Sequence, residues 1–450
     1  ADSSQTVSFQ ATLPNGGTLT HQYIIRPNNY LLDFNMAFSG AEKLFTGNLM
    51  LLQWQTRATQ HEKDAKYERQ QSQIVYLEDE GYDYMASKSE KTFEKGVSWV
   101  SVKQQFFNVT LVAKEKFDNG SVHWVRDVND TTGIISQATA NFNKKLSGNS
   151  IATVPLQIYY GPNDYKILRN IGVDKMDKII NLGQGIYSFV RPINQYIIIP
   201  VFNFFRNNIA SMGIVILLLT LFIRLVTSPL IYTSYLSGAK MKALRPELDV
   251  LKKKFPDQQA YSMEQMKLFR EVGVNPLGGC IPALLQIPIF FALYSLFNSS
   301  IALRGEHFLW AKDLSTYDAI AHLPFSIPGY GDHVSLFTLT AVATSFLISI
   351  SNMNMTPDQS NPALKYMPYI FPFVLLLIFN NLPAALTWYY TVSNFITLVL
   401  QWVINHYIID HDQILAKLEE NKKKPKTKSK WQEKLEQIQE QQKGMNVKKK

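Results

Sequence analysis

The chain has 450 residues and a net charge of +9, and 46% of its residues are hydrophobic whereas 18% are charged. Soluble domains carry roughly 25% charged residues, so part of this chain is expected to be shielded from water. One cysteine, Cys280, excludes an intramolecular disulfide and a zinc site built from several cysteines. The positive charge favours nucleic acid or an anionic membrane as a partner. Residues 1–200 carry 20 basic and 19 acidic side chains and residues 201–450 carry 25 and 17, so the excess lies in the second half.

The first 165 residues alternate apolar and polar side chains, a pattern typical of half-buried β-strands. Turn signals separate the alternating stretches, for example Pro-Asn-Gly-Gly at 14–17. The predicted strands lie at 7–13, at 19–38 with a break at 27–29, at 97–112 and at 122–128. We therefore predict an antiparallel β-sandwich domain over residues 1–170. Its histidines are isolated and its acidic residues are scattered, so the sequence indicates no catalytic set there.

From residue 174 the apolar residues recur with helical spacing. Ile186, Phe189 and Ile193 belong to one apolar stripe, and Arg191 lies outside it. This pattern predicts an amphipathic helix over 171–207 that lies on the bilayer surface before the first membrane span. A connector helix packed on the sandwich fits the same pattern equally well.

Long stretches with at most one charged residue follow residue 206. A membrane-spanning helix needs about 20 apolar residues, so the stretch over 366–409 is long enough for two helices, divided at Asn380-Asn-Leu-Pro383. Five transmembrane helices are predicted, at about 209–232, 276–299, 334–353, 367–381 and 384–409, within a membrane core over 208–409. Buried helices of a large soluble protein are the alternative, which these lengths disfavour.

The basic residues of the connecting segments predict the orientation of the spans. Residues 233–275 carry eight basic side chains and the tail over 410–450 carries twelve, whereas residues 301–332 carry only Arg304 and Lys312. The loop and the tail are therefore expected in the cytoplasm, and residues 1–208 outside it. The sequence starts with Ala-Asp-Ser-Ser and carries no export signal, so we expect an upstream signal or membrane anchor in the natural chain.

Arg224 lies inside the first predicted span, where an arginine costs about 2.5–3.5 kcal/mol on insertion scales. It can face a water-filled cavity, extend to the cytoplasmic surface or pair with a buried acid. The spans contain no Asp or Glu, which disfavours pairing. We predict a hydrophilic, substrate-binding groove lined by Arg224, Thr220, Gln286, Thr344, Tyr390, Ser393 and Asn394. Taken singly, a Ser or Thr in a span can instead bond to a carbonyl of its own helix.

Two predicted helices at 234–255 and 258–272, joined by a Pro-Asp turn, form a charged hairpin within 233–275. The expected apolar seam consists of Met241, Leu244, Leu248, Leu251, Met263, Met266 and Phe269. The basic residues of the hairpin include Lys240, Lys242, Arg245, Lys252, Lys253 and Lys254. The tail over 410–450 is basic and includes Lys422, Lys423, Lys424 and Lys426. Residues 422–430 and 448–450 of it form a low-complexity arm. It is expected to attract anionic lipids or the RNA of a ribosome held at the membrane.

The membrane core resembles the YidC/Oxa/Alb family of membrane protein insertases. The resemblance covers about residues 170–410, and includes Leu-Phe-Ile-Arg-Leu-Val-Thr-Ser-Pro-Leu at 221–230 and Trp-Tyr-Tyr-Thr-Val-Ser-Asn at 388–394. It also runs through 239–246, 275–294 and 308–314. The outer region is similar to the periplasmic β-sandwich of Gram-negative members. The chain departs from the family in lacking the first membrane helix and in its Asn380-Asn-Leu-Pro-Ala-Ala385 turn, where many members have Pro-Ser-Gly.

The resemblance implies a bacterial inner membrane protein with a periplasmic N-terminal domain and a cytoplasmic tail. Arg224 would be the groove arginine, Gln286 and Tyr390 would face the groove, and 233–275 would be a mobile hairpin. The implied activity is that of an insertase and chaperone rather than an enzyme, acting as a monomer without cofactor or metal. The implied partners are nascent membrane proteins, the ribosome, membrane lipids and the Sec translocon.

Two other functions are compatible with parts of the sequence. A small-solute or anion transporter would use Arg224 as an anion site, but such transporters have repeated halves with broken helices, and the sequence has no such symmetry. A structural anchor for lipids or ribosomes, with a carbohydrate-binding outer domain, is the second alternative.

Overall fold

The computed structural model describes residues 4–14, 16–126, 132–275, 281–353 and 362–423. Cys280, Lys424 and Lys426 lie outside the described residues. The chain forms two compact units. The first consists of residues 1–221, 286–341 and 375–392, and the second of residues 222–285, 342–374 and 393–450.

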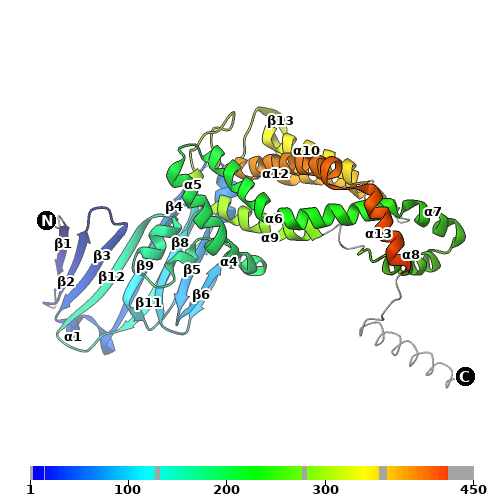
Figure 1. The fold of residues 1–450 in the computed structure, drawn as a ribbon. Helices are drawn as coiled ribbons and strands as arrows, with labels where there is room; N and C mark the ends of the chain where they lie inside the picture. The colour runs from blue at the N-terminus through cyan, green and yellow to red at the C-terminus, as the bar shows by residue number, and fades with distance from the viewer. Residues whose placement is uncertain (1–3, 15, 127–131, 276–280, 354–361, 424–450) are drawn as a thin grey trace, which may run out of the picture. The chain divides into compact units, whose positions relative to one another are not determined.

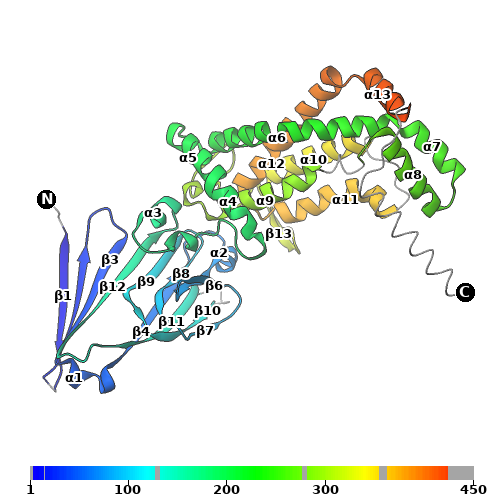
Figure 2. The same cartoon turned by 60° about the horizontal axis from the view of Figure 1, so that its bottom comes forward.

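The predicted antiparallel β-sandwich is confirmed and forms most of the first unit (Figure 1). The larger sheet has eight strands in the order β1-β2-β3-β12-β9-β8-β5-β6, with β1 at one edge (Figure 2), and the smaller has four in the order β4-β11-β10-β7. The strands are β1 Gln5–Thr12, β2 Thr18–Ile25, β3 Leu31–Ser39, β4 Leu49–Thr59, β5 Gln73–Glu78, β6 Gly81–Met85, β7 Glu90–Phe93, β8 Val97–Lys103, β9 Phe107–Phe117, β10 Asn119–Val125, β11 Ile134–Lys145 and β12 Ile151–Pro162. The short helices α1 (Ala41–Leu44), α2 (Ala65–Gln71) and α3 (Tyr165–Asn170) accompany them.

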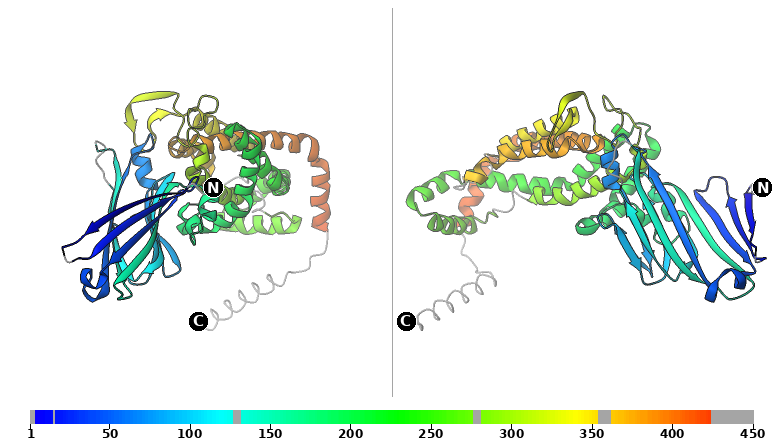
Figure 3. Two further views of the ribbon diagram at one scale, coloured as in Figure 1. Left: turned by 90° about the vertical axis from the view of Figure 1, so that its left-hand side faces the viewer. Right: turned by 180° about the vertical axis from the view of Figure 1, so that it is seen from behind.

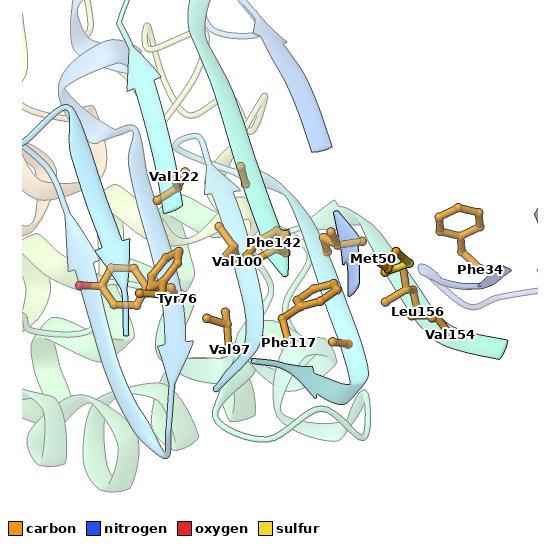
Figure 4. Close-up of a cluster of buried hydrophobic side chains, with 14 of the residues drawn as sticks. Phe34, Met50, Tyr76, Val97, Val100, Phe117, Val122, Phe142, Val154 and Leu156 are labelled. Carbon is orange, nitrogen blue, oxygen red and sulfur yellow. The ribbon is translucent and has the colours of Figure 1, made fainter. Parts of the chain in front are cut away.

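The sandwich core lies between the two sheets (Figure 4). Val97, Val100 and Phe117 of the larger sheet and Val122 and Phe142 of the smaller sheet belong to one buried cluster. The rings of Phe117 and Phe142 stack at 4.4 Å, so they join the sheets directly. The alternation of each strand directs one set of side chains into this layer, as the sequence pattern predicts.

The segment predicted as one amphipathic helix over 171–207 is not continuous. It starts with a 3-10 turn at Met176–Ile179, and an unbroken helical stretch begins only at Gly185. Gly183 and Gly185 have φ angles of 129° and 58°, which interrupt a right-handed helix. From there, helical turns of 3-10, α and π type lead into α5 (Ile199–Asn208). The stretch exposes an apolar stripe formed by Ile186, Phe189, Tyr196, Ile197 and Phe204.

Each of the five predicted spans coincides with an apolar helix. These are α6 (Met212–Ala243), α9 (Ile281–Ser299), α10 (Leu336–Met353), α11 (Pro362–Phe379) and α12 (Ala384–Val403). Within the described residues, α6 and α10 are long and apolar enough to cross a membrane, and α12 with its bent continuation would be a third. The described parts of α9 and α11 are shorter apolar helices. The connection before α10 forms a small hairpin, β13 (Ala321–Ile327) and β14 (Gly331–Val334), which was not predicted (Figure 3).

The charged hairpin over 233–275 differs from its prediction in the first helix. α6 continues to Ala243, and a separate helix α7 (Arg245–Lys254) begins there with Pro246 in its first turn. The second helix, α8 (Gln258–Val272), has the predicted bounds: the Asp257 side chain caps its start, and Gly273 ends it in a left-handed conformation. Met263 and Met266 are exposed, so their predicted place in the seam is wrong.

The seam is different because a further helix, α13 (His411–Lys423), packs on the hairpin. Leu268, Phe269 and Val272 of α8 share a buried cluster with Ile414 and Leu418 of α13. The start of the basic tail is therefore a packed helix, which the sequence did not predict. Leu418 and Ile414 are spaced four residues apart, which places both on the face that meets α8.

Candidate functional site: Arg224 and a polar seam

Arg224 lies in the second unit, on the apolar helix α6, and its side chain is half-buried. Two polar residues close to it on α6 bond to that helix. Thr227 Oγ1 donates to the Ile223 carbonyl at 2.9 Å, and Ser228 Oγ donates to the Leu225 carbonyl at 2.8 Å. These hydroxyls are satisfied locally, so they do not offer free groups to a ligand.

The partner of Arg224 comes from another helix. Its Nε donates to Oγ of Ser393 on α12 at 2.8 Å, and its Nη2 donates to the same oxygen. A guanidinium has five N–H donors, and one hydroxyl oxygen accepts only two of them here. Within the described part of the chain, no carboxylate lies within 4.0 Å of this guanidinium. The charge of Arg224 is therefore positioned by a neutral group and is not neutralised.

A seam of polar side chains continues from this contact between α10 and α12. Asn394 donates through Nδ2 to Ser345 Oγ at 2.7 Å and to Thr344 Oγ1 at 3.2 Å. Two turns further along α12, Gln401 donates to Asn352 Oδ1 at 3.1 Å. Residues 394 and 401 are spaced seven apart, so they share one helix face.

Several predicted groove residues therefore come together: Arg224 with Ser393, and Asn394 with Thr344. The prediction omitted Gln401 and Asn352. The sequence could have indicated Gln401, because an amide two turns after Asn394 in an apolar helix lies on the same helix face. The prediction also gave no partner for Arg224, because sequence alone does not say which polar residues of two helices meet.

The other predicted groove residues belong to the first unit. Thr220 is buried one turn before Arg224 on α6, and its hydroxyl donates to the Ile216 carbonyl at 2.7 Å. The ring of Tyr390 packs against those of Phe379 and Phe290, at 4.8 and 5.9 Å. Gln286 has a buried Nε2 atom without a hydrogen-bond partner among the described residues. Such a donor favours a water molecule or a polar ligand near it.

The outer faces of the same helices are apolar. Leu225, next to Arg224, is 73% exposed, and Phe395, next to Asn394, is 62% exposed. Exposed apolar side chains of this size are expected where lipid replaces water as the solvent. In each pair, the polar residue faces a neighbouring helix, and the apolar residue next to it in the chain is exposed.

The predicted basic residues of the hairpin lie mostly at its surface. Lys242, Lys252, Lys253 and Lys254 are exposed, and Lys240 and Arg245 are half-buried. Arg245 donates to the Met353 carbonyl at 3.2 Å. Lys422 pairs with Glu247 of α7, and Lys423 is the last residue of α13. Over the described ranges, no group of three or more His, Cys, Asp or Glu side chains is arranged to hold a metal ion.

Comparison with known proteins assigns the chain to a family. A family model described as the 60Kd inner membrane protein matches residues 204–411, and one described as the YidC periplasmic domain matches residues 1–196. The membrane protein insertase YidC of Amoebophilus asiaticus is 37% identical over 415 residues, which are 90% of this chain and 68% of that protein. The chain belongs to the YidC family of membrane protein insertases.

Other YidC relatives agree with this assignment. The membrane protein insertase YidC of Parabacteroides distasonis is 35% identical over 445 residues, covering 94% of this chain and 69% of that protein. A solved structure of an active YidC insertase aligns over 90% of this chain and 80% of its own, with a TM-score of 0.38 and 17% identity. The YidC assignment confirms the family resemblance seen in the sequence and makes the chain an inner membrane protein with a periplasmic domain.

Proposed function

We propose that this chain inserts nascent membrane proteins into the inner membrane by receiving their polar tails at Arg224. The observation that carries the proposal is an unneutralised guanidinium inside an apolar helix, bonded to Ser393 and continued by a polar seam. The names of the YidC relatives support the same activity. The proposed role of the site is that of a binding surface rather than an enzyme.

The physical task of such a protein is to lower the cost of moving polar groups through hydrocarbon. Each unsatisfied backbone group costs several kcal/mol in lipid, and a charged side chain costs more. A hydrated groove reaching Arg224 shortens the apolar distance that a tail crosses. The positive charge attracts an acidic tail, and the seam of Asn394, Thr344 and Ser345 offers hydrogen bonds along the way. The apolar helix of the client then moves into lipid along exposed faces such as those of Leu225 and Phe395.

We further propose the arrangement around this core. Residues 1–170 form the periplasmic domain, 208–409 the membrane core with five spans, and 233–275 and 410–450 the cytoplasmic parts. The exposed stripe of Ile186, Phe189 and Tyr196 suits a helix lying at the bilayer surface, which is the reason to place 171–207 there. Nascent membrane proteins are the substrates, and the ribosome, the Sec translocon and membrane lipids are partners of a monomer. We propose that Thr220, Gln286 and Tyr390 also line the groove.

The decisive measurement uses the chain reconstituted into vesicles with a single-span client that has a short acidic tail. Arg224→Ala should lower the initial rate of tail translocation about tenfold or more, since a hydrogen bond to a charged group is worth roughly 1.5–3 kcal/mol. Arg224→Lys keeps the charge and should retain part of the rate. Ser228→Ala is the matched control, because its hydroxyl bonds only to its own helix.

A client with a neutral tail provides the second control and should respond weakly to Arg224→Ala. Equal loss for both clients would assign Arg224 a structural role and contradict the proposal. Solute flux through the same vesicles in the absence of client insertion would favour a transporter instead.

A further inference from the structure

A cavity lies in the first unit, between the sandwich, the helices α3 and α5 and the end of α9. One part, of about 670 Å³, is lined by the ends of β9 and β12, α3 and the residues after α9. An adjoining part, of about 520 Å³, is lined by α3, α5 and the end of α9. The two parts share Asp164, Ile167, Arg206 and Ile301 along their walls, so they form one continuous hollow. Figure 2 shows α3 and α5 above the sheet.

Contacts between the sandwich and the end of α9 hold this hollow open in a defined shape. The hydroxyl of Tyr67 on α2 donates to Asn298 Oδ1, and the side-chain amide of Gln105 donates to the Asn298 carbonyl at 3.4 Å. Arg304 donates to Glu62 Oε1 at 2.8 Å and lies over the Phe107 ring at 5.3 Å. The walls therefore come from elements that are fastened to one another.

The hollow carries positive charge that is not neutralised. Arg206 and Lys166 line it, and for neither side chain does the described structure contain a hydrogen bond or ion pair. The one carboxylate on its walls, Asp164, accepts the backbone N–H groups of Lys166 and Ile167 as the cap of α3. Glu62 forms an ion pair with Arg304, so Arg304 adds N–H donors to the hollow but no net positive charge. An anionic ligand would therefore contact the unpaired side chains of Arg206 and Lys166, whereas the Asp164 carboxylate already accepts two backbone N–H groups.

The floor of the same hollow is apolar. Ile199, Phe202, Leu182 and Leu296 are buried side chains on its walls. A free inorganic ion gains nothing from such a surface, whereas an amphiphilic molecule buries apolar area there at about 25 cal/mol per Å². The combination of exposed cations and buried apolar side chains fits a headgroup joined to hydrocarbon.

The position of the cations along the chain points to the membrane surface. Arg206 lies shortly before Met212, the first residue of α6, and Arg304 lies shortly after Ser299, the last residue of α9. α6 starts and α9 ends beside the sandwich, so both arginines belong to the same side of the membrane core. Phe204, next to this site, is 65% exposed on the apolar stripe. A membrane span that starts at Met212 would place Arg206 in the headgroup region, where the phosphates of lipids lie.

We infer that the hollow binds the phosphate headgroup of an anionic phospholipid, with Arg206 and Lys166 as its cationic contacts. Arg304 supplies further N–H donors from a position set by Glu62, and Ile199 and Phe202 contact the start of the acyl chains. Bound lipid would connect the sandwich to the bilayer surface. This inference does not depend on insertase activity, because it concerns lipid binding by the purified chain.

The test measures binding of a soluble short-chain phosphatidylglycerol to the full chain in neutral detergent, by native mass spectrometry and by titration calorimetry. Arg206→Gln and Lys166→Gln should each raise the dissociation constant about tenfold, the effect of losing one hydrogen bond to a charged group. Arg57→Gln is the matched control: it removes the same charge from an exposed position on β4 and should leave the constant unchanged. Circular dichroism and melting curves establish that the variants fold.

Competitors identify the source of the phosphate. Glycerol 3-phosphate and inorganic phosphate should compete at least tenfold more weakly than the lipid, because they do not reach the apolar floor. Equal competition by them would overturn the lipid assignment in favour of a free phosphate. Equal binding of short-chain phosphatidylcholine would overturn the requirement for an anionic lipid. Binding that Arg206→Gln and Arg57→Gln leave equally intact would overturn the site.

Discussion

Arg224 is half-buried and Lys103 is buried, and the two basic side chains have different roles. Arg224 is bonded to Ser393 and keeps donors free for a ligand, which suits a binding role. Lys103 on β8 is 3% exposed, lines no described cavity, and its Nζ has only the Gln71 carbonyl at 3.5 Å. Burial lowers the pKa of Lys103 to about 8. The charge of Lys103 therefore lowers the free energy of unfolding and does not belong to a binding site.

Lys103→Met should therefore stabilise the sandwich at pH 7. The folded chain binds this proton less tightly than the unfolded chain, whose lysine has a pKa near 10.5. The penalty is complete below pH 8, and the free energy of unfolding rises with pH between about 8 and 10.5 as the penalty disappears. The gain at pH 7 is expected to be about 2–3 kcal/mol, from roughly 1.4 kcal/mol per pKa unit.

The measurement compares melting midpoints of the variant and the parent chain in detergent at pH 7 and pH 10. The difference should shrink at the higher pH. Lys116→Met, at an exposed position, is the control and should give a small difference at both values. A difference independent of pH would mean that packing, and not charge, is responsible.

Gly213 at the start of α6 is needed for close packing. A Cβ atom there would lie 2.1 Å from the Phe308 ring, and Trp388 Nε1 donates to the Gly213 carbonyl at 3.0 Å. Alanine normally stabilises a helix relative to glycine by about 1 kcal/mol. Here we expect Gly213→Ala to destabilise by about 1–3 kcal/mol through overpacking, seen as a lower melting midpoint. Phe308→Ala in the same chain should recover part of the loss, and a purely additive double variant would refute the contact.

At the level of elements, the helix α13 determines how the charged hairpin over 233–275 is packed. It buries Ile414 and Leu418 against α8, and Asn421 donates to the Val272 carbonyl at 3.1 Å (Figure 1). The sequence pattern predicted α8 correctly because its ends carry explicit signals, Asp257 and Gly273. It did not predict the seam, because α7 and α8 each have more than one weakly apolar face and only the position of α13 selects among them.

Leu418→Ala should loosen the hairpin from α13. A buried leucine truncated to alanine costs about 2–5 kcal/mol, so amide hydrogen exchange in residues 258–272 should accelerate. Leu415→Ala is the matched control, since Leu415 is an exposed leucine of the same helix. Similar exchange in both variants would show that the packing of α13 does not stabilise α8.

For the whole molecule, charge and apolarity are distributed by compartment. The sandwich buries its apolar side chains between two sheets, whereas α11 exposes residues such as Ile370, Phe371 and Phe373. A protein surrounded by water would not leave such a face open, and a bilayer is the solvent that suits it. The excess positive charge lies in the segments after the first span, where it predicts a cytoplasmic location.

The basic tail should bind ribosomes through its positive charge. Replacing the lysines at 424, 426, 428 and 430 with glutamine keeps the length of the chain and should weaken cosedimentation with ribosomes. The salt dependence should also become shallower, because fewer phosphate contacts release fewer counterions. The comparison is a variant in which Lys242 and Lys254 of the hairpin are replaced with glutamine, and its cosedimentation with ribosomes should fall less than that of the tail variant. If binding is unchanged by salt and by the tail replacements, the tail has no part in it.

The sequence by itself determined the order of a β-sandwich and five apolar helices, the ends of α8, and the position of Arg224 within hydrocarbon-like surroundings. These features depend on local patterns: strand alternation, uninterrupted apolar length, and capping residues. Only the tertiary structure decided that Ser393 is the partner of Arg224, that Asn394 meets Thr344 and Ser345, and that α13 completes the hairpin. Such contacts join residues far apart in the chain, and a helix with several polar or apolar faces does not specify which face meets which neighbour until all of them are packed.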